Sequence, residues 1–154
     1  MDEHLKMVYQ KIASYCAYQE RTHEEVRKKL GEFFIEEEDA EELIVRLIQD
    51  NFLNEERFAK SFASGKFRIK KWGKRRILHE LKQKNLSEYS IRSAIQEIPA
   101  GDYEEVLLKL AQKKLLAIAG KESNKLIQKK KLVTFLVQKG YEPELVWKII
   151  QPLV

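Results

Sequence analysis

The chain has 154 residues, with 29 Lys and Arg against 24 Asp and Glu, a net charge of +5 and an apolar share of 44%. Charged residues make up 34% of it, so the composition excludes a disordered tail, which would be less apolar, and a membrane protein, which would be less charged. No apolar run approaches the roughly 20 residues that cross a bilayer. With a single Cys and no secretory-signal pattern at the start, we expect a folded cytoplasmic protein that has no disulfide and no contact with membranes.

Apolar residues recur at spacings of three and four along the chain and nowhere alternate, which predicts an all-α protein. Only six Gly and three Pro interrupt it, so long stretches are free to be helical. We expect about nine helices, around apolar positions at 8–16, 26–30, 40–48, 58–62, 77–81, 91–98, 106–111, 132–137 and 146–150.

Several residues predict where helices begin and end. Thr22 with Glu25, and Asp102 with Glu105, have the spacing of a capping box and predict two helix starts. The third helix is expected to begin at either residue 36 or residue 39. The other signals are Asn54, Ser87 and Ser123 as single N-caps, Pro143 in a first turn, and Asn51 and Gly140 at left-handed helix ends.

An internal repeat relates the helices. Residues 80–96 align with residues 135–151 at an offset of 55, which pairs Leu81 with Leu136 and Ile95 with Ile150, and a weaker copy starts at residue 26. We therefore expect three tandem three-helix repeats, at 1–57, 58–101 and 102–154. A unit of about 50 residues has little core of its own, so each is expected to bury an apolar face of its neighbour in an elongated, curved molecule.

The charge differs from repeat to repeat. The first has a net charge of −7, the second +8 and the third +4. Basic repeats favour an anionic partner, such as nucleic acid or an acidic protein surface, although charges that simply face water would give the same pattern. The Lys-rich stretch 113–131 leaves the same two interpretations open.

Catalysis has no support in the sequence. The three His are far apart and have no metal-ligand spacing with Cys16, and there is no Gly-rich phosphate loop or nucleophile motif. Cys16 lies among the apolar positions of the first helix and is predicted to be a core residue. We expect no enzyme activity, no cofactor, no metal and no small-molecule substrate.

The segment 66–76 has the highest density of charge in the chain. Seven of its eleven residues are basic, two are aromatic, and Gly73 marks a corner between two helices. Cations at a helix start are unfavourable because they oppose the helix dipole, so their presence here favours a role in binding. A helix start with Arg can hold a phosphate or a carboxylate. Trp72 is interpreted either as a packing wedge at this corner or as part of the binding surface. The basic candidates are Lys66, Arg68, Lys70, Lys71, Lys74, Arg75 and Arg76.

Three motifs in residues 53–84 carry a family resemblance. Residues 53–59, 71–77 and 80–84 resemble the Asp-x-Arg-Phe-Ala, aromatic-Gly-x-x-Arg-Ile and Glu-Leu-x-x-Lys-Gly elements of the RecX regulatory proteins. The likeness runs from about residue 8 to the end and is weakest in the third repeat. Asn85 departs from the pattern, because Gly usually ends that helix.

The resemblance implies a bacterial modulator of the RecA recombinase. Such a protein would bind RecA and the groove of its filament on single-stranded DNA, suppress filament growth, ATP hydrolysis and strand exchange, and bind DNA directly only weakly. The contact residues it implies are Lys70, Lys71, Trp72, Lys74, Arg75, Arg76 and Lys84. The structural residues of its motifs are Arg57, expected to pair with a carboxylate, Phe58, Gly73 at the corner, Ile77 and Leu81.

Two other classes of function stay open on the sequence. Each three-helix unit could offer a helix to a groove as helix-turn-helix domains do, which would make the protein a direct nucleic-acid binder. A purely structural helical-repeat adaptor is the other class, and it would not respond to DNA, whether naked or in a filament.

Overall fold

The computed structural model describes residues 1–154 and consists of nine helices with no strand. The prediction of an all-α chain with about nine helices is confirmed. The helices are α1 (Glu3–Tyr18), α2 (His23–Leu30), α3 (Glu37–Gln49), α4 (Glu55–Arg68), α5 (Lys74–Lys82), α6 (Glu88–Gln96), α7 (Ala100–Ala119), α8 (Lys125–Gln138) and α9 (Pro143–Ile150).

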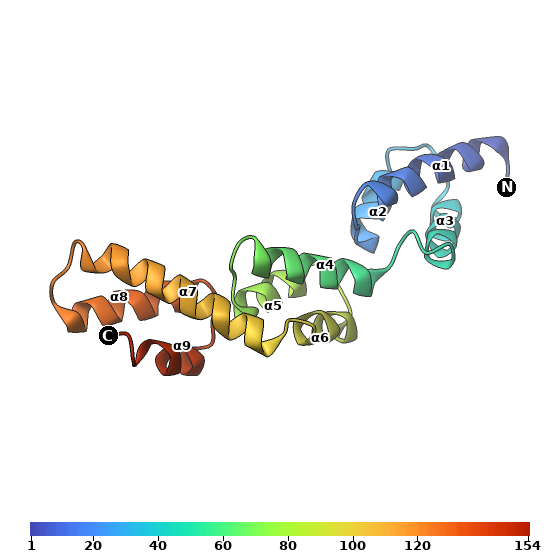
Figure 1. Ribbon diagram of the computed structural model, residues 1–154. Coiled ribbons are helices and arrows are strands. Elements are labelled where there is room, and N and C mark those ends of the chain that lie inside the picture. Colours follow the sequence, from blue (N-terminus) through green and yellow to red (C-terminus); the bar gives the residue numbers. More distant parts are fainter.

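The helices lie in threes along an elongated molecule. Figure 1 shows α1–α3 at one end, α4–α6 in the middle and α7–α9 at the other end. Within each of these three groups the helices pack on one another. The expected tandem three-helix repeats in an elongated, curved molecule are confirmed, while boundaries at residues 57 and 101 stay a prediction. None of the helices has the length and apolar character needed to cross a membrane.

The apolar interior is divided into two cores. One core of 17 buried residues runs through the second and third groups together, and a separate core of 10 buried residues lies inside the first group. The expectation that every unit buries an apolar face of its neighbour is therefore wrong for the first group. The reason is that polar side chains join this group to the second, among them Glu20 to Arg57 and Glu24 to Asn85.

Most of the expected helix signals are where the sequence places them. Thr22 and Glu25 form a full capping box, Asn54 and Ser87 cap α4 and α6, and Pro143 opens α9. Asn51 and Gly140 have φ of 65° and 107°, and α3 follows an N-cap at residue 36.

Two predicted helix starts are wrong. The helix α7 begins at Ala100, after Pro99, so Asp102 lies in the first turn and pairs with Arg68 instead of capping. The N-cap of α8 is Asn124, whose side chain accepts from two backbone N–H groups, and not Ser123.

Candidate functional site

The corner between α4 and α5 is held by close contact with the corner between α8 and α9. The Gly73 N–H donates to the Lys139 carbonyl at 2.8 Å, and the Arg75 N–H donates to the Gly140 carbonyl at 3.0 Å. A Cβ on Gly73 would lie 2.2 Å from the carbonyl carbon of Gly140. Gly73 has an ordinary φ of −77°, so glycine is required here for the approach of two backbones rather than for an unusual conformation.

Two buried tyrosines complete this corner. The Lys74 N–H donates to the Tyr103 hydroxyl at 2.8 Å, and that hydroxyl donates to the Glu142 carboxylate. The Tyr141 hydroxyl donates at 2.9 Å to the carbonyl of Lys71, which has a left-handed φ of 61°. Burial raises the pKa of both tyrosines, so they stay neutral hydrogen-bond donors. The third group thereby fixes the geometry of the basic corner in the second.

These bonds change the expected role of the α5 helix start. The backbone N–H groups of Gly73, Lys74 and Arg75 are all used within the protein. These three donors are therefore not open to an anion, because the third group supplies acceptors to them, and the expected anion site at this helix start stays a prediction. An anionic partner would have to meet the side chains.

Five side chains of the second group form a surface in which cations alternate with aromatic rings, here called the cation–aromatic row. Its members in order are Lys84, Phe62, Lys66, Trp72 and Arg76. The Lys84 Nζ lies 5.1 Å from the Phe62 ring centroid, and the Lys66 Nζ lies 5.3 Å from Phe62 and 5.0 Å from Trp72. The Arg76 guanidinium lies 4.1 Å from Trp72. These distances suit cation–π attraction, which fixes the cations without neutralising them.

Trp72 combines the two roles that the sequence left open. Its ring is half-buried against the large core, and it also lies between the cations of Lys66 and Arg76. It is thus a packing wedge and a member of the surface.

The other basic candidates lie outside the row. Arg68 pairs with Asp102 at 3.5 Å and is the only one of the predicted contact cations, as distinct from the structural Arg57, with a carboxylate within 4.0 Å. The Lys74 Nζ lies 4.7 Å from the Tyr103 ring. The remaining candidates, Lys70, Lys71 and Arg75, are exposed at the corner.

The residues predicted to be structural occupy two kinds of place. Ile77 and Leu81 are fully buried, and Phe58 is 8% exposed. Arg57 pairs with Glu20 and also donates to the Asn51 side chain and the Phe52 carbonyl, both at 3.3 Å. Arg57 therefore links the second group to the end of α1 and to the segment before α4.

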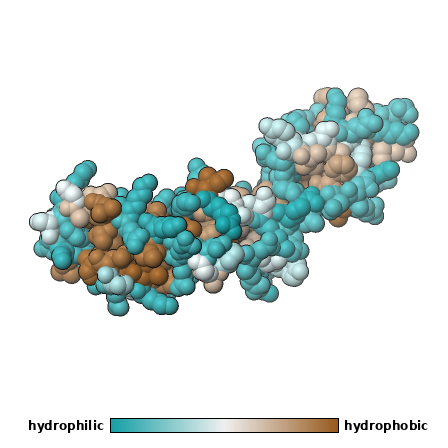
Figure 2. Space-filling model, viewed as in Figure 1, coloured by the Kyte–Doolittle hydropathy of each residue, from teal (hydrophilic) through white to brown (hydrophobic).

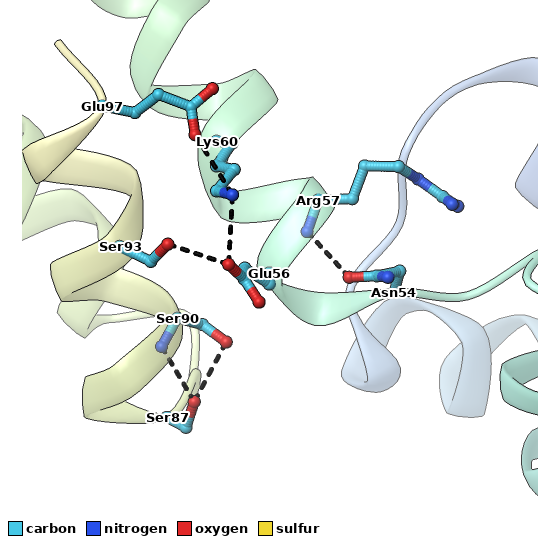
Figure 3. A network of polar contacts seen from close by, with 8 residues as sticks. All are labelled: Asn54, Glu56, Arg57, Lys60, Ser87, Ser90, Ser93 and Glu97. Atoms are coloured by element: carbon cyan, nitrogen blue, oxygen red, sulfur yellow. Dashed lines mark hydrogen bonds and ion pairs between the residues drawn. The ribbon is translucent and has the colours of Figure 1, made fainter.

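A polar network on another side of α4 holds Lys60, a cation that is not part of the cation–aromatic row. Lys60 lies 3.1 Å from both Glu56 and Glu97, and the Ser93 hydroxyl donates to Glu56 at 2.8 Å (Figure 3). The hydrogen bonds from Ser93 and Lys60 lower the pKa of Glu56, and its carboxylate raises the pKa of Lys60. The network joins α4 to α6 and neutralises Lys60, and Figure 3 shows the Arg57 side chain pointing away from it.

Sequence reasoning missed several residues that shape this surface. Phe62 is central to the row, and the i, i+4 spacing of Phe58, Phe62 and Lys66 could have indicated it. Tyr103, Tyr141 and Glu142 had no local signal, because their partners lie 29 to 70 residues away along the chain.

Comparisons with known protein families and with curated proteins both point to one family. Two family models match the chain, "RecX, second three-helix domain" over residues 54–95 and "RecX, third three-helix domain" over residues 102–150. Among curated relatives named "Regulatory protein RecX", the one from Clostridium perfringens is 32% identical over 86% of this chain and 62% of its own length. The relative from Lactobacillus gasseri is 33% identical over 91% of this chain and 51% of its own length. The chain thus spans about half to three-fifths of these relatives.

Similarity over the full length also occurs. The relative from Prosthecochloris aestuarii is 26% identical over 99% of this chain and 97% of its own. The crystal structure of RecX from Lactobacillus salivarius superposes with a TM-score of 0.86 over 99% of this chain and 98% of that one, at 24% identity. That likeness shows the same fold.

Proposed function

The chain belongs to the RecX family of regulatory proteins, and from this premise we propose that it acts on the RecA recombinase. It binds RecA and its filament on single-stranded DNA, and it inhibits filament growth, ATP hydrolysis and strand exchange. In this way it modulates recombination and DNA repair.

The observation that carries the proposal is a cationic surface without internal partners. Lys66, Arg76 and Lys84 lie beside aromatic rings, and none of them has a carboxylate within 4.0 Å. Arg76 is exposed and the two lysines are half-buried, and cations held at a fixed spacing are suited to carboxylates on a protein or to phosphates on DNA. The large core and the Gly73 contact keep this spacing rigid, so the surface is ready before a partner arrives.

The elongated shape supports a filament as the partner. Three helix groups in a row (Figure 1) offer contacts along a line rather than around a single pocket. A molecule lying along a helical groove meets neighbouring RecA protomers together, and the contact then opposes the movements that growth and ATP hydrolysis require. Arg76 supplies a planar group for paired hydrogen bonds, while Lys66 and Lys84 supply point charges.

The test compares two double variants with the same change in charge. In Arg76→Glu with Lys84→Glu, two cations of the row are reversed. In the control, Lys82→Glu with Arg92→Glu, two exposed cations of the same helix group are reversed that have neither a ring nor a carboxylate partner. Binding to RecA filaments on single-stranded DNA is measured by fluorescence anisotropy, with helix content checked by circular dichroism.

We expect the row variant to bind filaments at least about tenfold more weakly than the control, because a hydrogen bond to a charged group contributes about 1.5–3 kcal/mol. Equal affinities of the two variants would contradict the assignment of the surface. Binding of wild-type protein to filaments no better than to the DNA alone would contradict the proposed partner.

One observation favours direct nucleic-acid binding as a second candidate function. Trp72 is half-buried between two cations, an arrangement on which a base of single-stranded DNA could stack while its phosphates meet the cations. A direct binder would hold DNA without RecA, with an affinity that falls steeply as salt rises. Measuring the affinity for naked DNA at several salt concentrations separates this candidate from the first.

A further inference from the structure

The third helix group has a groove between α7 and α8, here called the lysine groove. It has a volume of about 430 Å³ and is lined by Lys114, Lys130 and Lys131 together with the apolar side chains of Ile118 and Phe135. None of the three lysines has a carboxylate within 4.0 Å. Figure 2 shows apolar side chains among hydrophilic ones at the end of the molecule that α7–α9 form. Cations beside apolar walls attract an anion more strongly than cations surrounded by water, because such walls focus the electric field.

The ring of Phe135 lies near two cations. The Lys114 Nζ is 4.5 Å from the ring centroid, and the Lys139 Nζ is 5.8 Å from it. All three side chains are half-buried, so their arrangement is held by packing while part of each stays open to solvent. Trp72 likewise lies near two cations of the cation–aromatic row. The lysine groove therefore repeats the chemistry of the row in the next group.

The internal repeat accounts for part of this likeness. The offset of 55 relates Lys131 to Arg76 and Lys139 to Lys84. Each of these four cations lies on the second helix of its group or within two residues of the end of that helix. The second and third groups thus present cations from the same positions of the repeat.

The first group shows that the fold does not require such cations to be free of carboxylates. The ring of Tyr15 also lies near two cations, with the Arg21 guanidinium at 3.6 Å and the Lys29 Nζ at 5.5 Å. Arg21 has Glu25 at 3.9 Å, and Lys29 has Glu32 at 2.9 Å. Carboxylates of the chain itself neutralise this pair of cations. The unpaired lysines of the third group therefore point to an anion outside the chain.

The lysine groove continues the basic corner of the second group. The Lys139 Nζ donates to the Lys70 carbonyl at 3.5 Å, and the Lys139 carbonyl accepts from the Gly73 N–H at 2.8 Å. Lys139 thus connects the corner to the ring of Phe135. A cationic surface that passes from one group to the next suits a long anion better than a small one.

The third group is basic through lysine alone. Residues 102–154 contain ten Lys and no Arg. Arg suits the paired recognition of one carboxylate or phosphate, whereas Lys is a flexible point charge. Flexible point charges suit an anion whose charges recur along a chain, because each neutralised phosphate releases counterions. A ring beside the charges adds a platform on which a base stacks. Recurring charges together with flat bases are features of a nucleic-acid strand and not of an acidic protein surface.

We infer that the lysine groove binds single-stranded nucleic acid. Lys114, Lys130 and Lys131 contact phosphates of the strand, and one base packs against the ring of Phe135. In a duplex the bases are already stacked on one another, so the ring adds no affinity there. The inference rests on direct nucleic-acid binding, the second candidate function, and not on contact with RecA.

The test measures the binding of a fluorescent oligothymidylate by anisotropy, without RecA and over a range of salt concentrations. The groove variant combines Lys114→Gln, Lys130→Gln and Lys131→Gln. The matched control combines Lys113→Gln, Lys121→Gln and Lys125→Gln, which change three exposed lysines of the same group that neither line the groove nor have a carboxylate within 4.0 Å.

A third variant, Phe135→Leu, removes the ring and keeps an apolar side chain against the large core. It is measured with the oligothymidylate and with a duplex. Circular dichroism verifies the helix content of every variant.

We expect the slope of log affinity against log salt concentration to be shallower by about 2 in the groove variant, because each phosphate contact on a single strand contributes about 0.7. The control changes the slope by less than one such contact. Phe135→Leu binds the oligothymidylate at least about fivefold more weakly with an unchanged slope, and it binds the duplex as the wild type does.

An unchanged slope in the groove variant, an equal change in the control, or full affinity of Phe135→Leu for the oligothymidylate would each overturn the inference. A groove variant that loses affinity for RecA filaments but not for the oligothymidylate would also overturn it, because an acidic protein surface would then be the occupant. A wild type that does not bind the oligothymidylate would contradict both this inference and the second candidate function. Regulation of the filament is tested separately, because RecA is absent from the first measurement.

Discussion

The substitution Gly73→Ala tests whether the second and third helix groups depend on backbone contact at their corners. The added Cβ would lie 2.2 Å from the Gly140 carbonyl carbon, 2.3 Å from the Tyr141 nitrogen and 2.4 Å from the Gly140 oxygen. All three atoms belong to the backbone, so no side-chain rotation removes the clash. The two corners must move apart by more than 1 Å to restore an ordinary contact of 3.4 Å.

The movement would break the hydrogen bonds from Gly73 to Lys139 and from Arg75 to Gly140, now 2.8 and 3.0 Å long. A buried donor left without a partner costs about 1–3 kcal/mol. The opposing contribution is small, because Ala at this ordinary φ of −77° stabilises by only about 0.4–1 kcal/mol through the unfolded chain. The net expectation is a loss of about 2–4 kcal/mol in the free energy of unfolding, or about 5–15 °C in Tm.

Thermal melting followed at 222 nm gives the change in stability, and hydrogen exchange shows where it occurs. Exchange should rise across α4–α9, which share one core, and stay unchanged across α1–α3, which have their own. The control is Gly65→Ala, since a Cβ at this position in α4 meets nothing within 4 Å and favours the helix by up to about 1 kcal/mol. A Gly73→Ala protein as stable as Gly65→Ala would refute the argument.

Three further changes follow from other contacts. Tyr141→Phe removes the bond to the Lys71 carbonyl and should lower the free energy of unfolding by about 1 kcal/mol in chemical denaturation, and an unchanged midpoint would count against that bond. The hydrogen bond from Ser93 lowers the pKa of Glu56 in the folded protein. The contribution of Glu56 to the free energy of unfolding is therefore complete above the usual glutamate pKa of about 4.3 and is lost as the pH falls through the lower folded pKa. Glu56→Gln should make the free energy of unfolding fall less steeply in acid. Arg57→Met should widen the distance distribution in small-angle scattering at constant helix content, and an unchanged distribution would show that Arg57 does not hold the first group in place.

The sequence predicts the helices well because their signals are local. Apolar spacing, the Thr22 capping box and the caps at Asn54 and Ser87 all act within one or two turns. Where two local signals compete, the outcome depends on contacts that the sequence does not display. Asp102 has the spacing of a cap, but it pairs with Arg68, and α7 begins earlier.

The arrangement of the site is less visible in the sequence. The basic segment and Trp72 are evident from composition, and the row places three of the predicted cations beside rings. The loss of free donors at the start of α5 is not evident, because the acceptors come from Gly140, Lys139 and Tyr103, at least 29 residues away along the chain. Because these long-range contacts use the backbone donors, Lys74 and Arg75 can meet a partner only through their side chains.

The most direct test of the proposed function is the rate of ATP hydrolysis by RecA on single-stranded DNA while this protein is titrated from far below to near equimolar with RecA. We predict inhibition far below equimolar amounts, retained by the Lys82 and Arg92 control variant and weakened in the Arg76 and Lys84 variant. No inhibition, or inhibition only when enough protein is present to coat the DNA, would contradict the proposal that the protein regulates the filament.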